Sequence, residues 1–201
     1  MSAARIGVVL AGGRATRMGG DKAGAMLGDR TLLAHAIGIV RAAGLQARVC
    51  ARADTVLPAV DGLTEAHVWR EPRSGHAPAD AHPLRGVAHA ARTAGEPIVV
   101  LPLDLPLLPP AVLTALAVQH APLAVVGEAG RPAALIARVD WSHADALDEA
   151  ADTGAPALRT LLAMGAAVRE LTDLAPGLEA TLALKNVNDA SDLEAARVAL
   201  D

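Results

Sequence analysis

The sequence predicts an α/β fold, a single Rossmann-like domain of three layers with a mostly parallel central sheet. Short apolar runs that suit buried strands alternate with amphipathic segments that suit helices along the whole chain, which is the pattern of α/β domains. The length of 201 residues fits one domain, 1–201, because chains usually divide only beyond about 250 residues. A hydrophobic fraction of 52% supplies enough apolar side chains for a core.

The elements of the N-terminal half follow from local patterns. The run 5–10 is apolar and ends in glycines, which predicts a first strand buried on both faces. The segment 31–43 has apolar residues at helical spacing and stops at Gly44, a residue suited to a helix C-terminus. By the same reasoning, strands are predicted at 48–51, 66–69 and 98–101, and helices at 84–94 and 111–119.

The C-terminal half is less regular. Strands are predicted at 123–126, 133–139 and 166–171, and helices at 142–151 and 157–164. The last helix is predicted to begin at Ser191, because Ser191 and Glu194 have capping-box spacing. Leu193, Ala196 and Leu200 would form its apolar stripe.

Composition argues against two classes of partner. The only aromatic residues are Trp69 and Trp141, and the net charge is −4, so a nucleic-acid interface lacks both stacking side chains and a basic excess. The most apolar stretch, 97–113, is interrupted by prolines and Asp104 and does not suit a membrane span. The run 5–10 is too short for a signal peptide, and a single cysteine, Cys50, fits a reducing compartment, so we expect a cytoplasmic protein.

A glycine-rich segment follows the first strand. Residues 10–22 read L-A-G-G-R-A-T-R-M-G-G-D-K, with Arg17 and Lys22 as the cations nearest its end. Adjacent glycines at the carboxyl end of a strand let backbone N–H groups approach an anion, and open α/β sheets bind ligands there. The spacing matches neither G-x-G-x-x-G nor the P-loop, and a plain glycine turn with solvated basic residues is the alternative.

A single carboxylate, Asp104, interrupts the apolar segment after the predicted strand 98–101. A charge is costly to bury without a partner, and Mg²⁺ commonly binds through one or two carboxylates together with substrate phosphates. Asp104 is therefore a candidate metal ligand. The alternative is an aspartate that caps a turn before Pro106.

Two further motifs have functional and structural interpretations. Residues 83–86 read P-L-R-G and fit either a ligand-facing turn or an ordinary helix start. Asn186 and Asn188 precede the last helix, where asparagine amides suit either recognition of a polar heterocycle or helix capping.

These motifs together resemble one family. The segment 10–22 is similar to the signature L-A-G-G-x-x-x-R-M-G-x-D-K of the nucleotidyltransferase family that includes molybdenum cofactor guanylyltransferase. Asp104 is similar to the family's D-x-P after a strand, and residues 83–86 to its G-P-L-x-G, with His82 in place of the first glycine, where a side chain would narrow the base pocket. Residues 186–193 resemble its N-V-N-T-P-E-D-L.

The resemblance implies roles for individual residues. Arg17, Lys22 and Asp104 would act in catalysis, the two cations on phosphates and Asp104 as the Mg²⁺ ligand. Arg131 stands where the family has the histidine of a His-Pro pair; it would meet an anionic acceptor or, alternatively, be a surface arginine. Asn186 and Asn188 would approach the acceptor or the metal. The nucleotide-binding residues implied are Leu10, Ala11, Gly12, Gly13, Lys22, Glu71, Gly86 and Asp104.

The activity implied is transfer of GMP from GTP to a phosphorylated pterin-type acceptor, Mo-molybdopterin, with release of pyrophosphate. Its product would be the molybdopterin guanine dinucleotide cofactor, and molybdoenzymes or other proteins of the cofactor pathway would be its protein partners. CMP transfer, nucleotidyl transfer to another phosphorylated acceptor, and a noncatalytic nucleotide-binding carrier remain alternatives. The role of the long loop between Glu71 and Pro83 is open.

Overall fold

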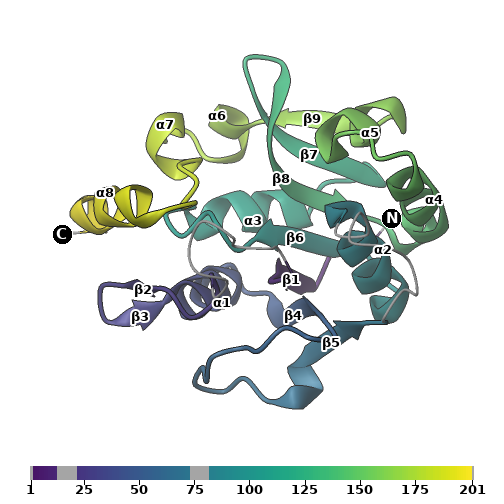
Figure 1. Ribbon diagram of the computed structural model, residues 1–201. Coiled ribbons are helices and arrows are strands. Elements are labelled where there is room, and N and C mark those ends of the chain that lie inside the picture. The colour runs from purple at the N-terminus through teal and green to yellow at the C-terminus, as the bar shows by residue number, and fades with distance from the viewer. Residues whose placement is uncertain (1, 13–21, 73–81, 201) are drawn as a thin grey trace.

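The computed structural model describes residues 2–12, 22–72 and 82–200 (Figure 1). Among these residues, seven strands form one sheet in the order β5-β4-β1-β6-β8-β7-β9. Every strand runs parallel to the others except β8, which is antiparallel to both β6 and β7. The strands of this sheet are β1 Ile6–Leu10, β4 Gln46–Arg52, β5 Val68–Glu71, β6 Ile98–Pro102, β7 Leu123–Glu128, β8 Arg131–Val139 and β9 Ala167–Glu170.

Helices cover both faces of the sheet, so the predicted α/β fold with a mostly parallel sheet is confirmed. Strand β1 shows how the layers form, because Val9 packs into the core on one face and Val8 into the core on the other. The first core includes residues of α1, α3, α6 and α8, and the second includes residues of α2, α4 and α5. The helices are α1 Leu32–Ala42, α2 Pro83–Ala94, α3 Pro110–Ala117, α4 Ala144–Asp152, α5 Ala157–Ala163, α6 Leu171–Leu174, α7 Ala180–Ala183 and α8 Ala190–Leu200.

The two helices nearest β1 in the chain have well-defined ends. Thr31 caps α1, its side chain accepting a hydrogen bond of 3.1 Å from the Ala34 backbone N–H, and Gly44 follows that helix with φ +77°. Helix α2 begins at Pro83. Proline has no N–H, but no hydrogen bond is lost, because N–H groups of the first turn have no partner within the helix. His82 supplies the N-cap of α2, and Gly95 ends the helix with φ +64°.

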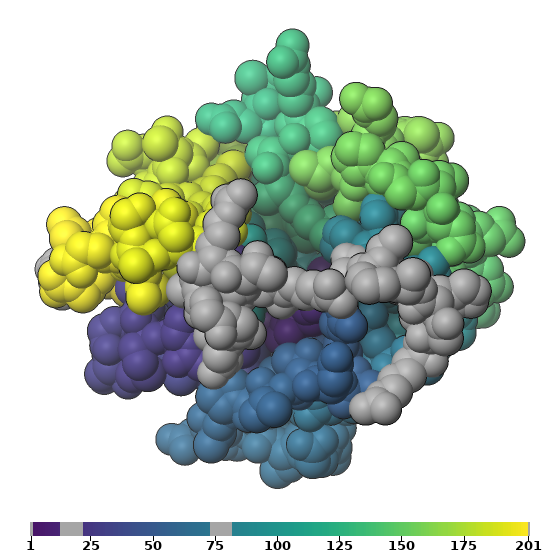
Figure 2. Space-filling model, in the orientation of Figure 1, coloured from purple at the N-terminus to yellow at the C-terminus, as the bar shows by residue number. Residues whose placement is uncertain are grey.

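A small hairpin and the C-terminal helix lie side by side although they are far apart in sequence. Strands β2 (Met26–Leu27) and β3 (Arg30–Thr31) form the hairpin, which the sequence did not predict because two-residue strands show no periodicity. Helix α8 packs against β2. Figure 2 shows the yellow surface of α8 next to the purple surface of this hairpin.

Three predicted elements need correction. Residues 65–67 form a 3₁₀ turn in which Thr64 and His67 bond to each other, so the strand predicted at 66–69 begins only at Val68. Helix α4 starts at Ala144, two residues after the predicted start, because a 3₁₀ turn occupies residues 141–143.

The last helix is capped by Asp189, not by Ser191. The Asp189 side chain accepts hydrogen bonds from the backbone N–H groups of Ser191 and Asp192, at 2.9 and 3.0 Å. The predicted apolar stripe is also only partly right, since Ala196 is buried but Leu200 is exposed. Among the described residues, no helix combines the length and the apolar character needed to cross a bilayer.

Candidate active site

A cavity of about 820 Å³ opens at the carboxyl ends of β1, β4, β5 and β6. Its size lies within the range of small-molecule sites, roughly 300 to 1,000 Å³. Strands β1 and β6 are neighbours in register, and the chain leaves β1 through α1 on one face and reaches β6 through α2 on the other. This is the switch point of the sheet, where open α/β folds bind ligands.

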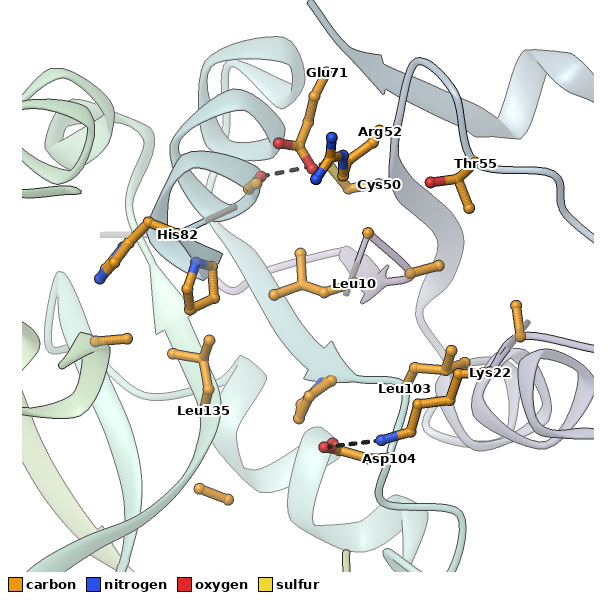
Figure 3. Close-up of a pocket in the computed structure, with 18 of the residues that line it drawn as sticks. Leu10, Lys22, Cys50, Arg52, Thr55, Glu71, His82, Leu103, Asp104 and Leu135 are labelled. Carbon is orange, nitrogen blue, oxygen red and sulfur yellow. Dashed lines mark hydrogen bonds and ion pairs between the residues drawn. The ribbon is translucent and has the colours of Figure 1, made fainter. Parts of the chain in front are cut away.

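The walls of the cavity come from several elements. Leu10 at the end of β1 lies in the middle of the cavity, and Leu103 and Leu135 add apolar surface (Figure 3). The first turn of α2 and the start of α5 close it from the other side of the sheet. Polar groups gather at two ends of this apolar floor, which we call the Lys22 end and the Glu71 end.

At the Lys22 end, residues from distant parts of the chain meet around one ammonium group. Lys22 Nζ lies 3.4 Å from Asp104 Oδ2 and donates a hydrogen bond of 3.0 Å to Asn188 Oδ1. The Lys22 and Asp104 side chains are only 16% and 28% exposed. The backbone N–H of Val187 donates to the Asp104 carbonyl at 2.9 Å, which fixes the segment with the two asparagines against Asp104.

The oxygen donors at this end fit a hard divalent cation. The Asp104 carboxylate and the amide oxygen of Asn188 converge on the same ammonium group, and Asn186 lines the cavity beside them. No group of three His, Cys, Asp or Glu side chains that could hold a metal occurs among the described residues. A cation held here would therefore take further ligands from a substrate, as Mg²⁺ does with phosphates.

At the Glu71 end, an acidic and a basic side chain stand on neighbouring strands. Arg52 and Glu71 are the last residues of β4 and β5 and are partners in the ladder. Burial raises the pKa of the Glu71 carboxyl above its usual value, and the positive charges of Arg52 and Arg85 partly offset this. Glu71 Oε1 lies 3.1 Å from the position that a Cβ would take at Gly12 and also at Gly86. The two glycines thus leave the carboxylate the space that it occupies.

Cys50 lies under this end of the cavity as a buried thiol. Its Sγ donates a hydrogen bond of 3.4 Å to the Gly86 carbonyl. Burial raises the pKa of the thiol far above its usual value, and the nearby Glu71 carboxylate raises it further. A thiol held protonated in this way is not a nucleophile at neutral pH.

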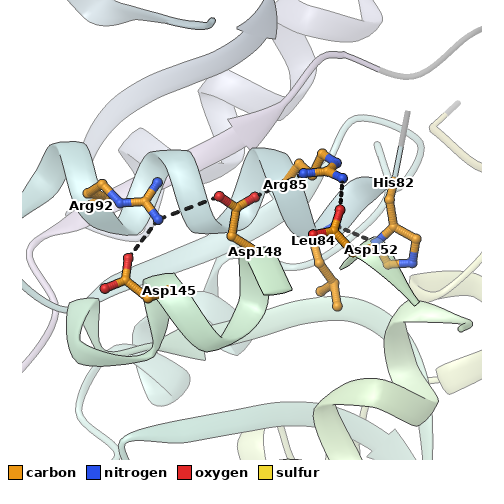
Figure 4. A network of polar contacts seen from close by, with 7 residues as sticks. All are labelled: His82, Leu84, Arg85, Arg92, Asp145, Asp148 and Asp152. Atoms are coloured by element: carbon orange, nitrogen blue, oxygen red, sulfur yellow. Dashed lines mark hydrogen bonds and ion pairs between the residues drawn. The ribbon is translucent and has the colours of Figure 1, made fainter. Parts of the chain in front are cut away.

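Helix α2, which borders the cavity, is held to α4 by a network of charged side chains (Figure 4). Arg85 pairs with Asp148 at 3.3 Å and with Asp152, and Arg92 pairs with Asp145 at 2.8 Å. His82, which was expected to narrow the base pocket, does line the cavity. Its ring forms hydrogen bonds with the Leu84 N–H at 3.3 Å and with the Ala155 carbonyl at 2.7 Å. His82 therefore also ties the start of α2 to the segment before α5.

Most of the predicted site residues meet in this cavity. Asn188 accepts a hydrogen bond from Lys22. It is not the helix cap that the alternative interpretation suggested, because the Asp189 side chain caps α8. The predicted residues that line the cavity are Leu10, Ala11, Gly12, Lys22, Glu71, Gly86, Asp104 and Asn186.

Two predicted residues that the structure describes, Arg131 and Asn188, are not among those that line it. Gly13 and Arg17 lie outside the described residues. Arg131 is exposed at the start of β8, two residues before Ala133, which does line the cavity. Sequence reasoning missed Arg52, because the predicted strand ended at Ala51; the first polar residue after that apolar run was the available signal.

Comparisons of the sequence with known proteins show the family to which the chain belongs. A sequence model of the MobA-like NTP transferase domain matches residues 7–171. The chain is 34% identical over 134 residues to a molybdenum cofactor guanylyltransferase of Rhizobium leguminosarum bv. trifolii, an alignment that covers 62% of this chain and 58% of that protein. The match to the Acidiphilium cryptum protein of the same name is 33% over 150 residues and covers 74% of both.

The chain thus spans less than two thirds of the length of the Rhizobium relative. Over nearly the whole chain, the fold is that of a solved structure, molybdopterin-guanine dinucleotide biosynthesis protein A from Archaeoglobus fulgidus. The TM-score is 0.73 and the identity 20%, with 96% of this chain and 97% of that one covered.

Proposed function

The chain belongs to the family of MobA-like NTP transferase domains, and from this premise we propose that it is a guanylyltransferase. It transfers GMP from GTP to a phosphorylated pterin-type acceptor, Mo-molybdopterin, and releases pyrophosphate. The names of its relatives support this reaction and its product, the guanine dinucleotide form of the cofactor. Its protein partners would be molybdoenzymes or other proteins of that pathway, and its place is the cytoplasm, where the unpaired Cys50 stays reduced.

The observation that carries the proposal is the convergence of Lys22, Asp104 and Asn188 at one end of the cavity. In nucleotidyl transfer, an oxygen of the acceptor phosphate attacks the α-phosphorus, and the bond to the pyrophosphate oxygen breaks. This displacement needs no covalent protein nucleophile, because positioning and charge neutralisation lower the barrier. Lys22 supplies a compact positive charge for the polyphosphate, and Arg17 of the preceding segment would add a second.

Asp104 is the residue that would hold a divalent cation, with the Asn188 amide as a neighbouring oxygen donor. When bound, Mg²⁺ would neutralise the charge that develops on the phosphates. Lys22 Nζ lies 3.4 Å from the Asp104 carboxylate, so its ammonium group would stand beside a phosphate bound at this end of the cavity. Asn188 Oδ1 accepts a hydrogen bond from Lys22 and holds the ammonium group at this end of the cavity.

The Glu71 end would receive the nucleoside. The Glu71 carboxylate fills the space that Gly12 and Gly86 leave, and Leu10 and Ala11 line the same cavity, so a base would lie against this surface. Gly13 lies outside the described residues and is assigned to the nucleotide by the family resemblance. Arg131 and Asn186 are assigned to the acceptor, because Asn186 lines the cavity and Arg131 lies two residues before Ala133, which also lines it.

Pyrophosphate release tests the proposal. Purified protein is supplied with Mg²⁺, Mo-molybdopterin and GTP, CTP, ATP or UTP in separate reactions, and release with GTP should exceed release with the others. A preference for CTP would replace GMP transfer by CMP transfer. GTP binding without release on any acceptor, unchanged by Asp104→Ala, would instead identify a noncatalytic carrier.

A further inference from the structure

The ammonium group of Lys22 lies against the oxygens that were named above for a divalent cation. Lys22 Nζ donates a hydrogen bond of 3.0 Å to Asn188 Oδ1 and lies 3.4 Å from Asp104 Oδ2. Figure 3 shows the ammonium group directed at the Asp104 carboxylate. In the ligand-free chain, both oxygen donors therefore already face a positive charge that belongs to the chain itself.

The two oxygen donors are fixed, whereas the lysine side chain can move. The Val187 N–H donates to the Asp104 carbonyl at 2.9 Å, and Asp192 Oδ2 accepts from the Asn188 N–H at the same distance. These bonds hold the backbone of both donors in place. The Lys22 ammonium group, in contrast, is carried by a flexible four-carbon stem. Its contact with Asp104 is also longer than the 2.7 to 2.9 Å typical of charged hydrogen bonds, so it is an exchangeable contact.

A divalent cation in the empty cavity would have to compete with this ammonium group. Mg²⁺ binds oxygen at about 2 Å, so a cation on Asp104 Oδ2 would lie at most about 5.5 Å from Lys22 Nζ. Like charges at that separation repel each other, and the repulsion is strong here because the Lys22 and Asp104 side chains are only 16% and 28% exposed. The cation would also draw on the oxygens that Lys22 contacts.

From this arrangement, we infer that Lys22 acts as an internal counter-cation that keeps a divalent cation from binding to Asp104 before a nucleotide is present. The inference rests on the proposed function, because it takes Asp104 as the cation ligand. A polyphosphate would remove the block, since its oxygens accept hydrogen bonds from the ammonium group and offset its charge. Cation and nucleotide would then bind with positive coupling, in which each raises the affinity for the other by the same factor.

The test is a titration of the full chain with Mn²⁺ in the absence of nucleotide, followed by the electron paramagnetic resonance signal of the free ion. Mn²⁺ binds to the same kinds of oxygen ligand as Mg²⁺. Lys22→Met removes the charge and should bind Mn²⁺ roughly 10-fold more tightly than the unmodified chain, or better. Lys22→Arg keeps the charge and should bind Mn²⁺ as weakly as the unmodified chain. The double variant Lys22→Met, Asp104→Asn should lose the gain.

Lys185→Met is the matched control, because Lys185 is the only other lysine of the sequence and is not among the residues that line the cavity. Its Mn²⁺ affinity should equal that of the unmodified chain, which separates a local effect of Lys22 from a change in net charge. A gain in affinity also cannot result from misfolding of the Lys22→Met variant if Asp104→Asn abolishes it.

Two results would overturn the inference and leave the proposed function in place. One is an equal Mn²⁺ affinity of the unmodified chain and Lys22→Met, and the other is a gain that persists in the double variant. The proposed function fails separately, if the unmodified chain releases no pyrophosphate on any acceptor, whichever result the Mn²⁺ titration gives.

Discussion

Asp104→Asn separates the chemistry of the cavity from the stability of the fold. The substitution keeps the size of the side chain and removes its charge, so Lys22 loses an ion pair of 3.4 Å between side chains that are 16% and 28% exposed. Pairs that reach solvent contribute about 1 kcal/mol or less. The Asp104 carbonyl still accepts from Val187, so the backbone contact remains. A chain of this size should then lose about 2 to 4 °C in Tm.

The same change should cost activity far more than stability. Removal of one preorganised charge at a transition state typically lowers kcat by about 10²- to 10³-fold, or roughly 3 to 4 kcal/mol. Pyrophosphate release at saturating GTP measures kcat, and calorimetry measures Tm. Asp145→Asn is the control, because Asp145 also pairs with an arginine, at 2.8 Å, but lies on α4 outside the cavity wall. A loss of less than tenfold in a folded Asp104→Asn variant would refute the role given to this carboxylate.

Three further predictions concern stability and reactivity. Because burial raises the folded-state pKa of Glu71, the folded chain binds a proton there more readily than the unfolded chain; stability should fall as pH rises from the unfolded value of about 4.3 through the folded pKa. The urea midpoint of the Glu71→Gln variant should not fall over this pH range. If the midpoints of the variant and of the unmodified chain fell in parallel with pH, the role given to Glu71 would be wrong. Gly7→Ala in β1 places a Cβ 2.4 Å from Val40 Cγ1 and should lower the free energy of unfolding by about 1 to 3 kcal/mol in urea melts. An unchanged midpoint would mean that Val40 can move to accommodate the added methyl group. Cys50 should resist a thiol reagent at pH 8 until the chain is denatured, since burial raises its pKa; labelling of the native protein would show that the thiol is accessible.

The central strands could be predicted from the sequence because a parallel sheet buries both of their faces. Residues 98–101 and 123–126 are continuous apolar runs and are strands in the structure, as predicted. The prediction failed where local side-chain bonds decide the geometry. Asp189, and not Ser191, receives the N–H groups at the start of α8, and spacing alone does not distinguish two adjacent capping candidates.

The site was predictable as a set of residues but not as a geometry. Lys22 is separated from Asp104 by 82 positions and from Asn188 by 166, and no periodicity links such distant segments. The motifs named these residues one at a time. Their meeting depends on the order of strands in the sheet, which places the residues after β1 and β6 side by side.

The burial of central strands on both faces also indicates where their functional side chains lie. A strand buried on both faces has no room for charged side chains along its length, so its first polar residue beyond the apolar run lies at the carboxyl edge, where the ligand binds. Applied to β6, this rule gives Asp104. Applied to β4, the rule gives Arg52. The predicted strand ended one residue before Arg52, whereas in the structure Arg52 is the last residue of β4 and pairs with Glu71. Because Arg52 and Glu71 are partners in one ladder, a change that shifts the register of β4 against β5 should disturb the Glu71 end of the cavity while leaving the Lys22 end intact.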